Sequence, residues 1–476
     1  MTSTKPRRVL DPARWMGWVE AEMAARGVPG LSIAVVVDGE PTVARGFGVT
    51  AAEDGQPVTG TTLFRLASVT KVVTTIGLLR LVEQGHLELD RPIRDYLPGL
   101  RLRRRENTEN VTLRMLLSHT AGLSEGAIER PWRTERRAPE GLAAFVEEDL
   151  PRCPLVGGPG ELYFYSNLAF NLAGRAAEVA TGVPFARLFA EQVVGPLGLE
   201  RTFLDPTVAM TYPMAQRHRA DADGRIVVRH DGGDDTGFHP AGYVFSTASD
   251  MGRVIRMFLG RGRLDGRQVL RAETVETMWS PHADVRLGRG LHYGLAAVIE
   301  PDYKGIRRVG HEGVLRGYCA KMTMAPDHGV GVVVLYNHEY NEDPRFFTVR
   351  ERMVDQVFDE LLDLPPGPVR PGTAPVAASV ARRVAGRYAK VLGPVVAELV
   401  ADDTGLSLRY GDRTVPLHAT SGEFFVGPPT DEDIGDLPWP RTPYVIDDHV
   451  SVGVPASTSG PPGLITVNGQ PYRRVS

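Results

Sequence analysis

Ser68 and Lys71 are the residues whose spacing most directly suggests chemistry, because they form a Ser-x-x-Lys sequence that occurs once in the chain. A serine hydroxyl is a weak nucleophile and needs a base within hydrogen-bond reach. On a helix, residues three positions apart lie on one face, and apolar neighbours such as Val72 would lower the pKa of the lysine by excluding water. The pair predicts a serine nucleophile with a lysine base. The structural alternative is a helix-capping serine followed by an exposed lysine.

Two further clusters carry groups suited to moving protons or holding a carbonyl. Tyr165 and Asn167 lie in a Tyr-Ser-Asn sequence before a helical run. A phenol beside a lysine can shuttle protons, and an asparagine can hold a substrate carbonyl or the lysine itself. His311 and Gly313 belong to Gly-His-Glu-Gly, where the glycines allow close approach of a ligand. The structural alternatives are a core aromatic, a helix cap and a hairpin histidine.

The elements that must position these groups follow from periodicity. Apolar residues at helical spacing predict helices at 11–26, 68–84 and 346–362. The turn Asp38-Gly39 predicts a hairpin over 31–49. Strand patterns return in HYGLAAVIE, GIRRVG, GYCAKMTMAP and GVGVVVLYN, with His311 between two of them. Strands at both ends with helices between them predict an α/β fold, in which one antiparallel sheet is built from both ends of the domain.

A Pro- and Gly-rich segment, 364–378, separates two regions with different sequence patterns and is expected to be a linker. Residues 1–363 would form the catalytic domain. Residues 379–476 alternate apolar and polar residues around turn signals and show no helical pattern. They predict a second domain that is a small antiparallel β-barrel.

Together, the three motifs resemble the serine β-lactamase and penicillin-binding-protein superfamily, in its class C, esterase and D-aminopeptidase-like branch. The stretches VTLRMLLSHTAGL, PAGYVFSTASDMGRVIRMFL and VGPLGLERTF are similar to recurring family sequences, and the resemblance covers roughly 28–337. It implies a β-lactamase-like sheet flanked by helices, with an α-helical subdomain. The tail resembles a lipocalin-like domain that follows this catalytic domain in some family members. The resemblance assigns catalytic roles to Ser68, Lys71, Tyr165 and His311.

The same resemblance suggests how substrate is held. It implies an acyl-enzyme on Ser68, with an oxyanion hole made by its own N–H and one near Tyr318 or Cys319. Penicillin-hydrolysing relatives carry a lysine where this chain has His311, so efficient β-lactam hydrolysis is not expected. Arg474 at the end of the barrel is expected to pair with a substrate carboxylate in place of that lysine. The expected substrate-binding residues are Asn167, Gly313, Tyr318, Cys319 and Arg474.

The expected substrate is an amide, ester or thioester of a small peptide or ester, including D-configured ones. One alternative is a thioesterase that releases nonribosomal peptides by macrocyclisation, acting on a carrier-protein-bound or free peptidyl thioester. A second is a catalytically silent assembly scaffold. Ser124 lies in a G-x-S-x-G sequence, but the strand before it and the helix after it that this motif requires are not predicted.

Composition excludes several other classes. The formal net charge of -4 gives no reason to expect nucleic acid or an anionic membrane as a partner. Cys153 and Cys319 are too few for a disulfide framework and lack zinc-site spacing. We expect no metal and no cofactor. The apolar run at 31–37 is too short to span a bilayer, and a cytoplasmic protein is expected.

Overall fold

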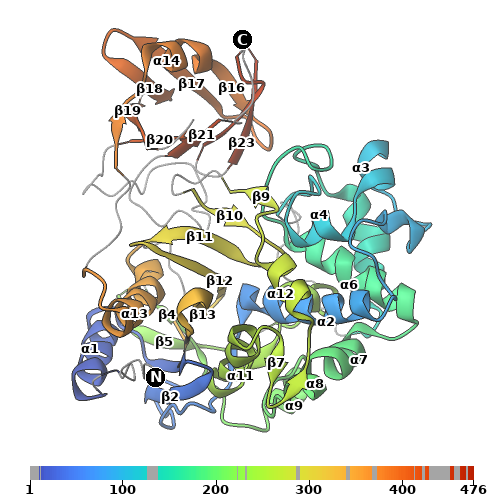
Figure 1. The fold of residues 1–476 in the computed structure, drawn as a ribbon, viewed down its shortest axis with the longest axis vertical. Coiled ribbons are helices and arrows are strands. Elements are labelled where there is room, and N and C mark those ends of the chain that lie inside the picture. The colour runs from blue at the N-terminus through green and yellow to red at the C-terminus, as the bar shows by residue number, and fades with distance from the viewer. Residues whose placement is uncertain are drawn as a thin grey trace, which may run out of the picture.

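A computed structural model shows a large α/β body and a small barrel above it (Figure 1). The structure describes these residues: 10, 12–125, 138–221, 223–230, 233–285, 290–338, 344–366, 372–411, 413–420, 424–427, 451–454, 461–467 and 470–475. Within these ranges, no helix combines the length and the apolarity needed to cross a bilayer.

The large body is built on an eight-stranded antiparallel sheet, with the order β2-β1-β14-β13-β12-β11-β10-β9. Its strands are β1 (Gly30–Val37), β2 (Glu40–Gly48), β9 (Ala283–Asp284), β10 (His292–Tyr293), β11 (Val298–Tyr303), β12 (Ile306–Leu315), β13 (Tyr318–Ala325) and β14 (Val330–Tyr336). Because β1 pairs with β14, the two ends of the domain meet at neighbouring strands. The predicted sheet assembled from both ends is confirmed.

The hairpin between β1 and β2 forms where it was predicted. Asp38 and Gly39 both adopt positive φ angles, 51° and 81°. Two positive φ angles define the turn that matches the twist of a two-residue hairpin. The strand β1 is buried along its whole length, so the turn delivers a continuous apolar strand to the centre of the sheet.

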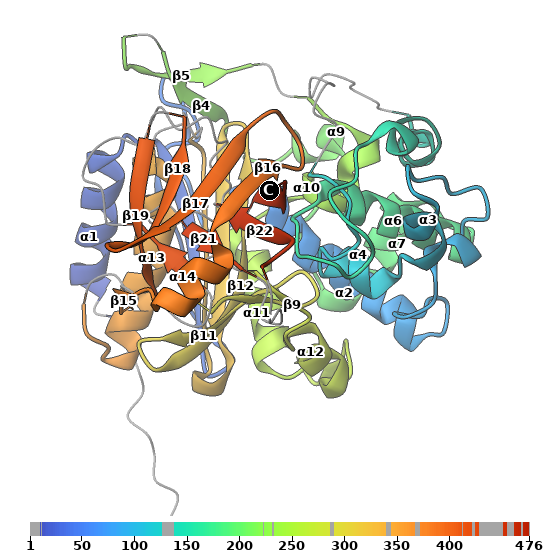
Figure 2. The same ribbon diagram turned by 90° about the horizontal axis from the view of Figure 1, so that it is seen from above.

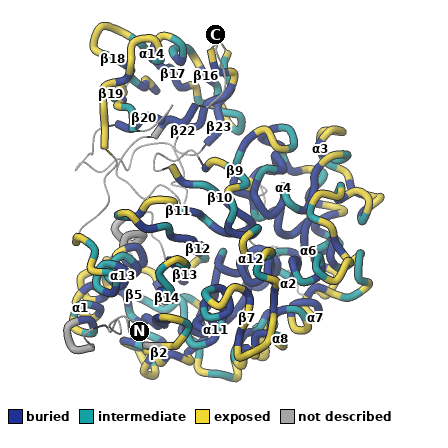
Figure 3. Tube along the Cα trace, viewed as in Figure 1, coloured by how far each residue is buried: buried dark blue, intermediate teal, exposed yellow. Residues whose placement is uncertain are grey.

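Helices cover both faces of the sheet (Figure 2). The helices α1 (Pro12–Ala25) and α13 (Pro344–Leu362) share one apolar cluster with one face. The helix α11 (Ala248–Leu259) packs against the other, where a second cluster continues into the helical subdomain. That subdomain includes α2 (Thr70–Glu83), α4 (Leu113–Leu117), α6 (Asn167–Thr181), α7 (Phe185–Phe189) and α10 (His239–Gly242). The helix α2 lies in its interior (Figure 3).

Two strand expectations were wrong in detail. The segment HYGLAAVIE is not one strand but two, β10 and β11, because Ala296 adopts a φ of 56° and the chain turns between them. His311 does not lie between strands but inside β12, which continues to Leu315, where it pairs with Tyr318 of β13. The hairpin turn therefore falls at 316–317, away from the histidine.

The second body is a closed antiparallel barrel, as predicted. Its order is β19-β18-β17-β16-β23-β22-β21-β20, and pairing of β19 with β20 closes it. The strands are β16 (Gly386–Lys390), β17 (Val396–Asp402), β18 (Gly405–Tyr410), β19 (Arg413–Ala419), β20 (Phe424–Val426), β21 (Ser451–Gly453), β22 (Leu464–Val467) and β23 (Gln470–Arg474), and β15 (Ala374–Pro375) adds to β19.

The barrel also contains a helix that the sequence pattern did not indicate, α14 (Ala378–Val384). It is a short helix of seven residues, too short to show clear periodicity. Ala381 and Val384 are its buried members and pack into the apolar core of the barrel.

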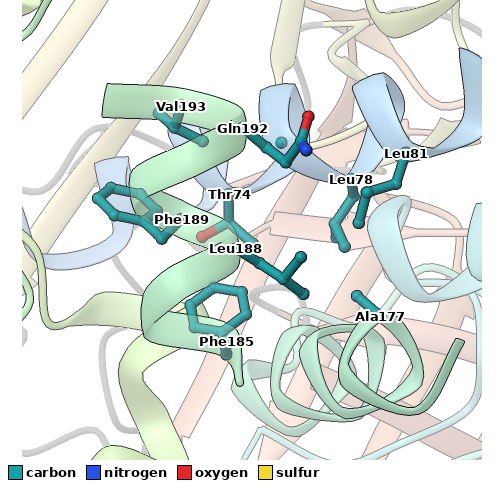
Figure 4. A pocket seen from close by; sticks show the side chains of 10 residues that line it. Thr74, Leu78, Leu81, Ala177, Phe185, Leu188, Phe189, Gln192 and Val193 are labelled. Carbon is teal, nitrogen blue, oxygen red and sulfur yellow. The ribbon is translucent and has the colours of Figure 1, made fainter. Parts of the chain in front are cut away.

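A small crevice opens beside α2 beyond the position of Lys71 (Figure 4). Its lining comes from α2, α6, α7 and the turn that follows α7, and it includes Leu78, Leu188 and Phe189. None of the lining residues is titratable. The crevice therefore offers no acid or base of its own.

Candidate active site

Ser68 lies on a single 3-10 turn, Ala67–Val69, that leads directly into α2. Its side chain is partly open to solvent, whereas Ala67 and Val69 are buried. Ala67 adopts a φ of 47°, a left-handed conformation that is strained for a residue with a side chain. Such strain persists only where the surroundings fix it, often at functional sites.

Gly313 brings the strand β12 against this turn. A Cβ atom at Gly313 would lie 2.8 Å from the backbone nitrogen of Ser68 and 2.4 Å from the carbonyl oxygen of Leu66. Both distances are shorter than real contacts, so no larger residue fits without movement. The described pairing of β12 with β11 ends at Gly310, which leaves the edge of β12 from His311 to Leu315 beside Ser68.

Lys71 makes three hydrogen-bond contacts through Nζ. The distances are 3.1 Å to Ser68 Oγ, 2.7 Å to Asn167 Oδ1 and 2.7 Å to the carbonyl oxygen of Ala241. The last two oxygens can only accept hydrogen bonds. A neutral amine has two N–H groups, and both are used by these acceptors. Its lone pair is then directed to the Ser68 hydroxyl, in the arrangement that proton removal requires.

The charge state of Lys71 fits this arrangement. Its side chain is completely buried. Burial lowers the pKa of Lys71 well below its usual value, and the charge of Glu125 opposes only part of that shift. A neutral amine near pH 7 is the form that can act as a base.

A buried ionic cluster lies behind the carbonyl that binds Lys71. The Asp234 carboxylate accepts hydrogen bonds from Arg65, at 3.3 Å, and from His239, at 3.0 Å. Arg65 also donates to the carbonyl oxygen of Tyr243 at 2.7 Å. Burial would raise the pKa of Asp234, but His239 and Arg65 together lower it. Because Ala241 lies within the stretch that these contacts anchor, the cluster fixes the acceptor for Lys71.

The Tyr165–Asn167 segment is held at the start of α6. Ser166 is the N-cap residue: its Oγ accepts from the Ala169 N–H at 3.2 Å and donates to the carbonyl oxygen of Ser124 at 2.6 Å. This cap explains why the helix begins here. The cap positions Asn167 Oδ1 to accept a hydrogen bond from Lys71 Nζ. It also positions the centroid of the Tyr165 ring 4.9 Å from Lys71 Nζ.

His119 is a neighbour of the site that was not singled out from the sequence. Its Nδ1 accepts from the Ser166 N–H at 3.1 Å, and its ring lies 4.4 Å from that of Tyr165. Burial, with the charge of Lys71 in second place, lowers the pKa of His119 well below its usual value. The only sequence signal was its position in the family-like stretch VTLRMLLSHTAGL. Because its pKa is lowered, the His119 ring is uncharged where it packs against the Tyr165 ring.

His311 is also buried and paired with an unpredicted residue. Its Nε2 lies 2.8 Å from the Tyr293 hydroxyl. Burial and then the charge of Lys71 lower the pKa of His311 to about 3. The ring is therefore neutral over the usual working range, and its centroid lies 6.2 Å from that of Tyr165. Tyr293 belongs to HYGLAAVIE, which was expected to be one strand. Its place beside His311 could not be predicted from that pattern.

A second ionic network lies behind β12, on the α13 side of the sheet. Arg350 is fully buried and donates to Glu312 and to Glu351, both at 2.9 Å. It also donates to the carbonyl oxygen of Gly313 at 3.4 Å. Burial raises the pKa of Glu312 to about 7, against the charge of Arg350. This network fixes the strand that faces Ser68.

Two further predicted residues, Tyr318 and Cys319, are neighbours on β13 and face opposite sides of the sheet. Tyr318 faces the site side of the sheet and donates its hydroxyl to the carbonyl oxygen of Ala215 at 2.7 Å. Cys319 is in register with Val314 on one side and Tyr336 on the other, so its N–H belongs to the ladder. Its side chain packs in the cluster on the opposite face. The edge of β12 is thus better placed than Cys319 for the second oxyanion donor.

Among the described residues, neither Arg474 nor Ser124 makes a hydrogen bond to Ser68. Arg474 donates within the barrel, to the carbonyl oxygen of Ala385 at 2.8 Å and to the Tyr388 hydroxyl at 3.0 Å. Its neighbour Arg473 instead pairs with Glu161 of the catalytic domain. The Ser124 side chain is fully buried. Gly126, which completes its motif, lies outside the described residues.

Comparisons with known proteins identify the family of the chain. The family model described as Beta-lactamase matches residues 16–353. The chain is 29% identical to Penicillin-binding protein 4 of Amycolatopsis lactamdurans over 345 residues, 69% of this chain and 86% of that protein. It is 28% identical to the D-alanyl-D-alanine-carboxypeptidase/endopeptidase AmpH of Escherichia coli K12, over 65% of this chain and 79% of that protein.

Among solved structures, that of SurE with D-Leu has a TM-score of 0.68 at 22% identity, covering 97% of this chain and 99% of that one. At this identity the likeness concerns the fold, and it includes the barrel. The chain belongs to the β-lactamase family and is a serine hydrolase-type enzyme with a C-terminal barrel.

Proposed function

We propose that the protein transfers the acyl group of a small peptide or ester, including D-configured ones, through an acyl-enzyme on Ser68. The observation that carries the proposal is the saturation of Lys71: two fixed acceptors take its N–H groups, which leaves its lone pair for the Ser68 proton. AmpH, by its name, acts on D-alanyl-D-alanine, and the SurE structure contains D-Leu. Both names support a D-configured substrate.

The proposed reaction has two halves. In the first, Ser68 Oγ bonds to the substrate carbonyl carbon while Lys71 takes its proton, and Tyr165 relays a proton to the departing amine or alcohol. The oxyanion is held by the Ser68 N–H and a second N–H from the edge of β12. In the second half, water attacks the acyl carbon while Lys71 takes its proton. The bond between the acyl carbon and Ser68 Oγ then breaks, and the proton returns to Oγ. An amine in place of water would give transfer or cyclisation.

The test is covalent labelling followed by intact-mass measurement. The protein is incubated with a serine-reactive fluorophosphonate, and with a panel of D- and L-configured esters and peptidyl thioesters. One adduct should form on the wild type and none on Ser68→Ala. The matched control is Ser124→Ala, which should label normally. Labelling that persists in Ser68→Ala would refute the assignment, and an unreactive wild type would favour a silent scaffold.

A further inference from the structure

Arg350 is a buried cation whose presence packing alone does not explain. Its side chain is completely enclosed on the α13 side of the sheet. Replacing a whole buried ionic network with apolar side chains of similar size is often neutral or even stabilising. Stability therefore gives little reason for a guanidinium at this position. The contacts of the guanidinium give another.

The hairpin between β12 and β13 determines which backbone groups of β12 face the site. Leu315 pairs with Tyr318 across a two-residue turn. Residues that flank such a turn bond to each other, and the direction of the backbone groups then alternates along the strand. The carbonyl of Gly313 therefore faces β13, and the N–H of Val314 faces the opposite edge. That edge is open here, because the described pairing of β12 with β11 ends at Gly310.

The peptide group that joins Gly313 to Val314 lies beside the nucleophile. A Cβ atom at Gly313 would be 2.8 Å from the backbone nitrogen of Ser68, so the two backbones are in direct contact. The N–H groups of Ser68 and Val314 are thus the pair available to a substrate oxygen. Because a peptide group is planar and conjugated, a contact that holds its carbonyl also sets the direction of its N–H.

Arg350 holds that carbonyl from the far side of the sheet. Its Nη1 donates to the Gly313 carbonyl oxygen at 3.4 Å, while Nη2 and Nε donate to Glu312 and Glu351, both at 2.9 Å. The guanidinium is a rigid planar fork, so the two ionic contacts fix the direction of the third. A cationic donor at the carbonyl oxygen also polarises the peptide group and strengthens its N–H as a donor.

We propose that Arg350 is a positioning residue for acyl transfer: by binding the Gly313 carbonyl oxygen, it orients and polarises the Val314 N–H as an oxyanion donor. This role rests on the proposed function and adds to it a residue that touches neither substrate nor nucleophile. Its contribution increases as negative charge develops on the substrate oxygen. It therefore favours the transition state over the bound substrate.

The test variant is Arg350→Met combined with Glu312→Gln. It removes the guanidinium together with the carboxylate that would otherwise be left buried and unpaired. Glu351 keeps its pairing with Lys321, at 3.3 Å. The double variant therefore avoids the largest destabilisation that loss of Arg350 alone would cause.

The matched control is Arg308→Met combined with Glu300→Gln. Arg308 is a buried arginine on the same strand, 2.7 Å from Glu300. Among the described residues its guanidinium contacts Glu300, Asp355 and the rings of Tyr303 and Phe358, and not the backbone of 311–315. The control thus removes the same groups from β12 without touching the oxyanion donor.

The measurement is the ratio of Ser68 acylation rates for 4-nitrophenyl acetate and for its thiono analogue, in which sulfur replaces the carbonyl oxygen. Sulfur is a weak hydrogen-bond acceptor, so the analogue gains little from oxyanion donors. Acylation by the oxygen ester should fall about tenfold in the Arg350 variant, because loss of a whole oxyanion donor costs about 10²–10³-fold. The ratio should fall by a similar factor, and the Arg308 control should keep the wild-type ratio.

A merely structural role for Arg350 would slow both esters alike and leave the ratio unchanged. Arg350→Lys covers the case in which the double variant does not fold, with circular dichroism as the check. The lysine keeps a cation between the two carboxylates but lacks the fork that supplies the third contact. The ratio should fall partway in this variant, with little change in KM.

The outcomes separate this role from the proposed function. A wild-type ratio in a folded Arg350 variant, or an equal decrease in the Arg308 control, would overturn the positioning role and leave acyl transfer intact. If 4-nitrophenyl acetate did not acylate Ser68 in the wild type, the proposed function would fail, and the positioning role with it.

Discussion

The catalytic domain and the barrel bury different kinds of residue. The catalytic domain encloses ionisable side chains, including Lys71, Glu312 and Arg350. Among the described residues of the barrel, the buried polar side chains are Thr466 and Gln470, which carry no charge. Enclosing a charge is costly unless its partners are fixed. The catalytic domain thus holds buried ionisable groups against fixed partners, as acid–base chemistry requires. The described interior of the barrel holds uncharged side chains that pack together.

The two domains meet at residues that precede Tyr165 in the chain. Leu464 of the barrel is buried in an apolar cluster with Leu162 and Phe164 of the catalytic domain. Beside it, Arg473 pairs with Glu161 at 2.9 Å. Both contacts fall on the segment that leads into Tyr165. In the described part of the chain, these two contacts connect the barrel to the segment before Tyr165, and variants on either side can test whether the connection matters.

The largest expected effect is on stability, from Arg350→Met. Loss of the guanidinium would leave Glu312 buried without its cation and Glu351 with Lys321 alone. Breaking a buried ion pair in this way typically costs about 3–5 kcal/mol. The free energy of unfolding, measured by denaturant titration, should fall by that order. Adding Glu312→Gln and Glu351→Gln should restore part of it. If Arg350→Met alone kept wild-type stability, the view that the catalytic domain depends on paired buried charges would be contradicted.

The next effect is on turnover. Lys71→Ala and Tyr165→Phe should each lower kcat by about 10²-fold or more, because each removes a group that transfers a proton. Esters and peptides should be affected alike, since both need the same proton transfers. Steady-state kinetics with both substrates checks this, with circular dichroism as the control for folding. Near-wild-type kcat in either variant would remove that residue from the relay.

A smaller effect is expected from the apolar contact between the domains. Leu464→Ala should cost about 2–3 kcal/mol of stability, because a buried leucine is truncated. If the barrel supports the tyrosine segment, the KM for a peptide substrate should rise while 4-nitrophenyl acetate hydrolysis changes little. Leu408→Ala, in the core of the barrel, is the control for general destabilisation. Equal kinetic changes in both variants would show that the contact has no specific role.

The smallest effect is expected from Arg473→Ala. The Arg473 and Glu161 side chains are 40% and 36% exposed, and such pairs contribute about 1 kcal/mol or less. Any change in KM should therefore be less than about fivefold. Arg409→Ala, which breaks an exposed pair with Glu398 inside the barrel, should have no kinetic effect. A large loss in Arg473→Ala alone would make the barrel part of the catalytic machinery.

Local patterns predicted much of this molecule. The β1–β2 hairpin was readable because the turn and the strands are adjacent in sequence. The helix that bears Ser68 and Lys71 was equally readable from its spacing. The start of α6 was also readable, although its cap is Ser166 and not Asn167, the residue that the sequence offered as a possible cap.

The supporting residues could not be predicted in this way. Tyr293 meets His311 only because the chain turns at Ala296 and β10 and β11 fold back. Arg350 meets Glu312 across 38 positions, through packing of α13 on the sheet. His119 and Glu125 join the site through backbone bonds to the segment at Ser166 and Asn167. These contacts depend on tertiary packing, and composition or periodicity carries no signal for them.

Because the barrel is closed, it offers no free sheet edge at β19 and β20 to which an extended peptide could bind. Pairing of β19 with β20 uses backbone groups that an open sheet would present at its edges. In the catalytic sheet, by contrast, the edge of β12 from His311 to Leu315 lies beside Ser68, beyond its described pairing with β11. An extended peptide that adds to this edge as a further strand gains main-chain hydrogen bonds whatever its side chains are. Affinity for such a peptide would then come from the sheet edge and not from the side chains of the peptide.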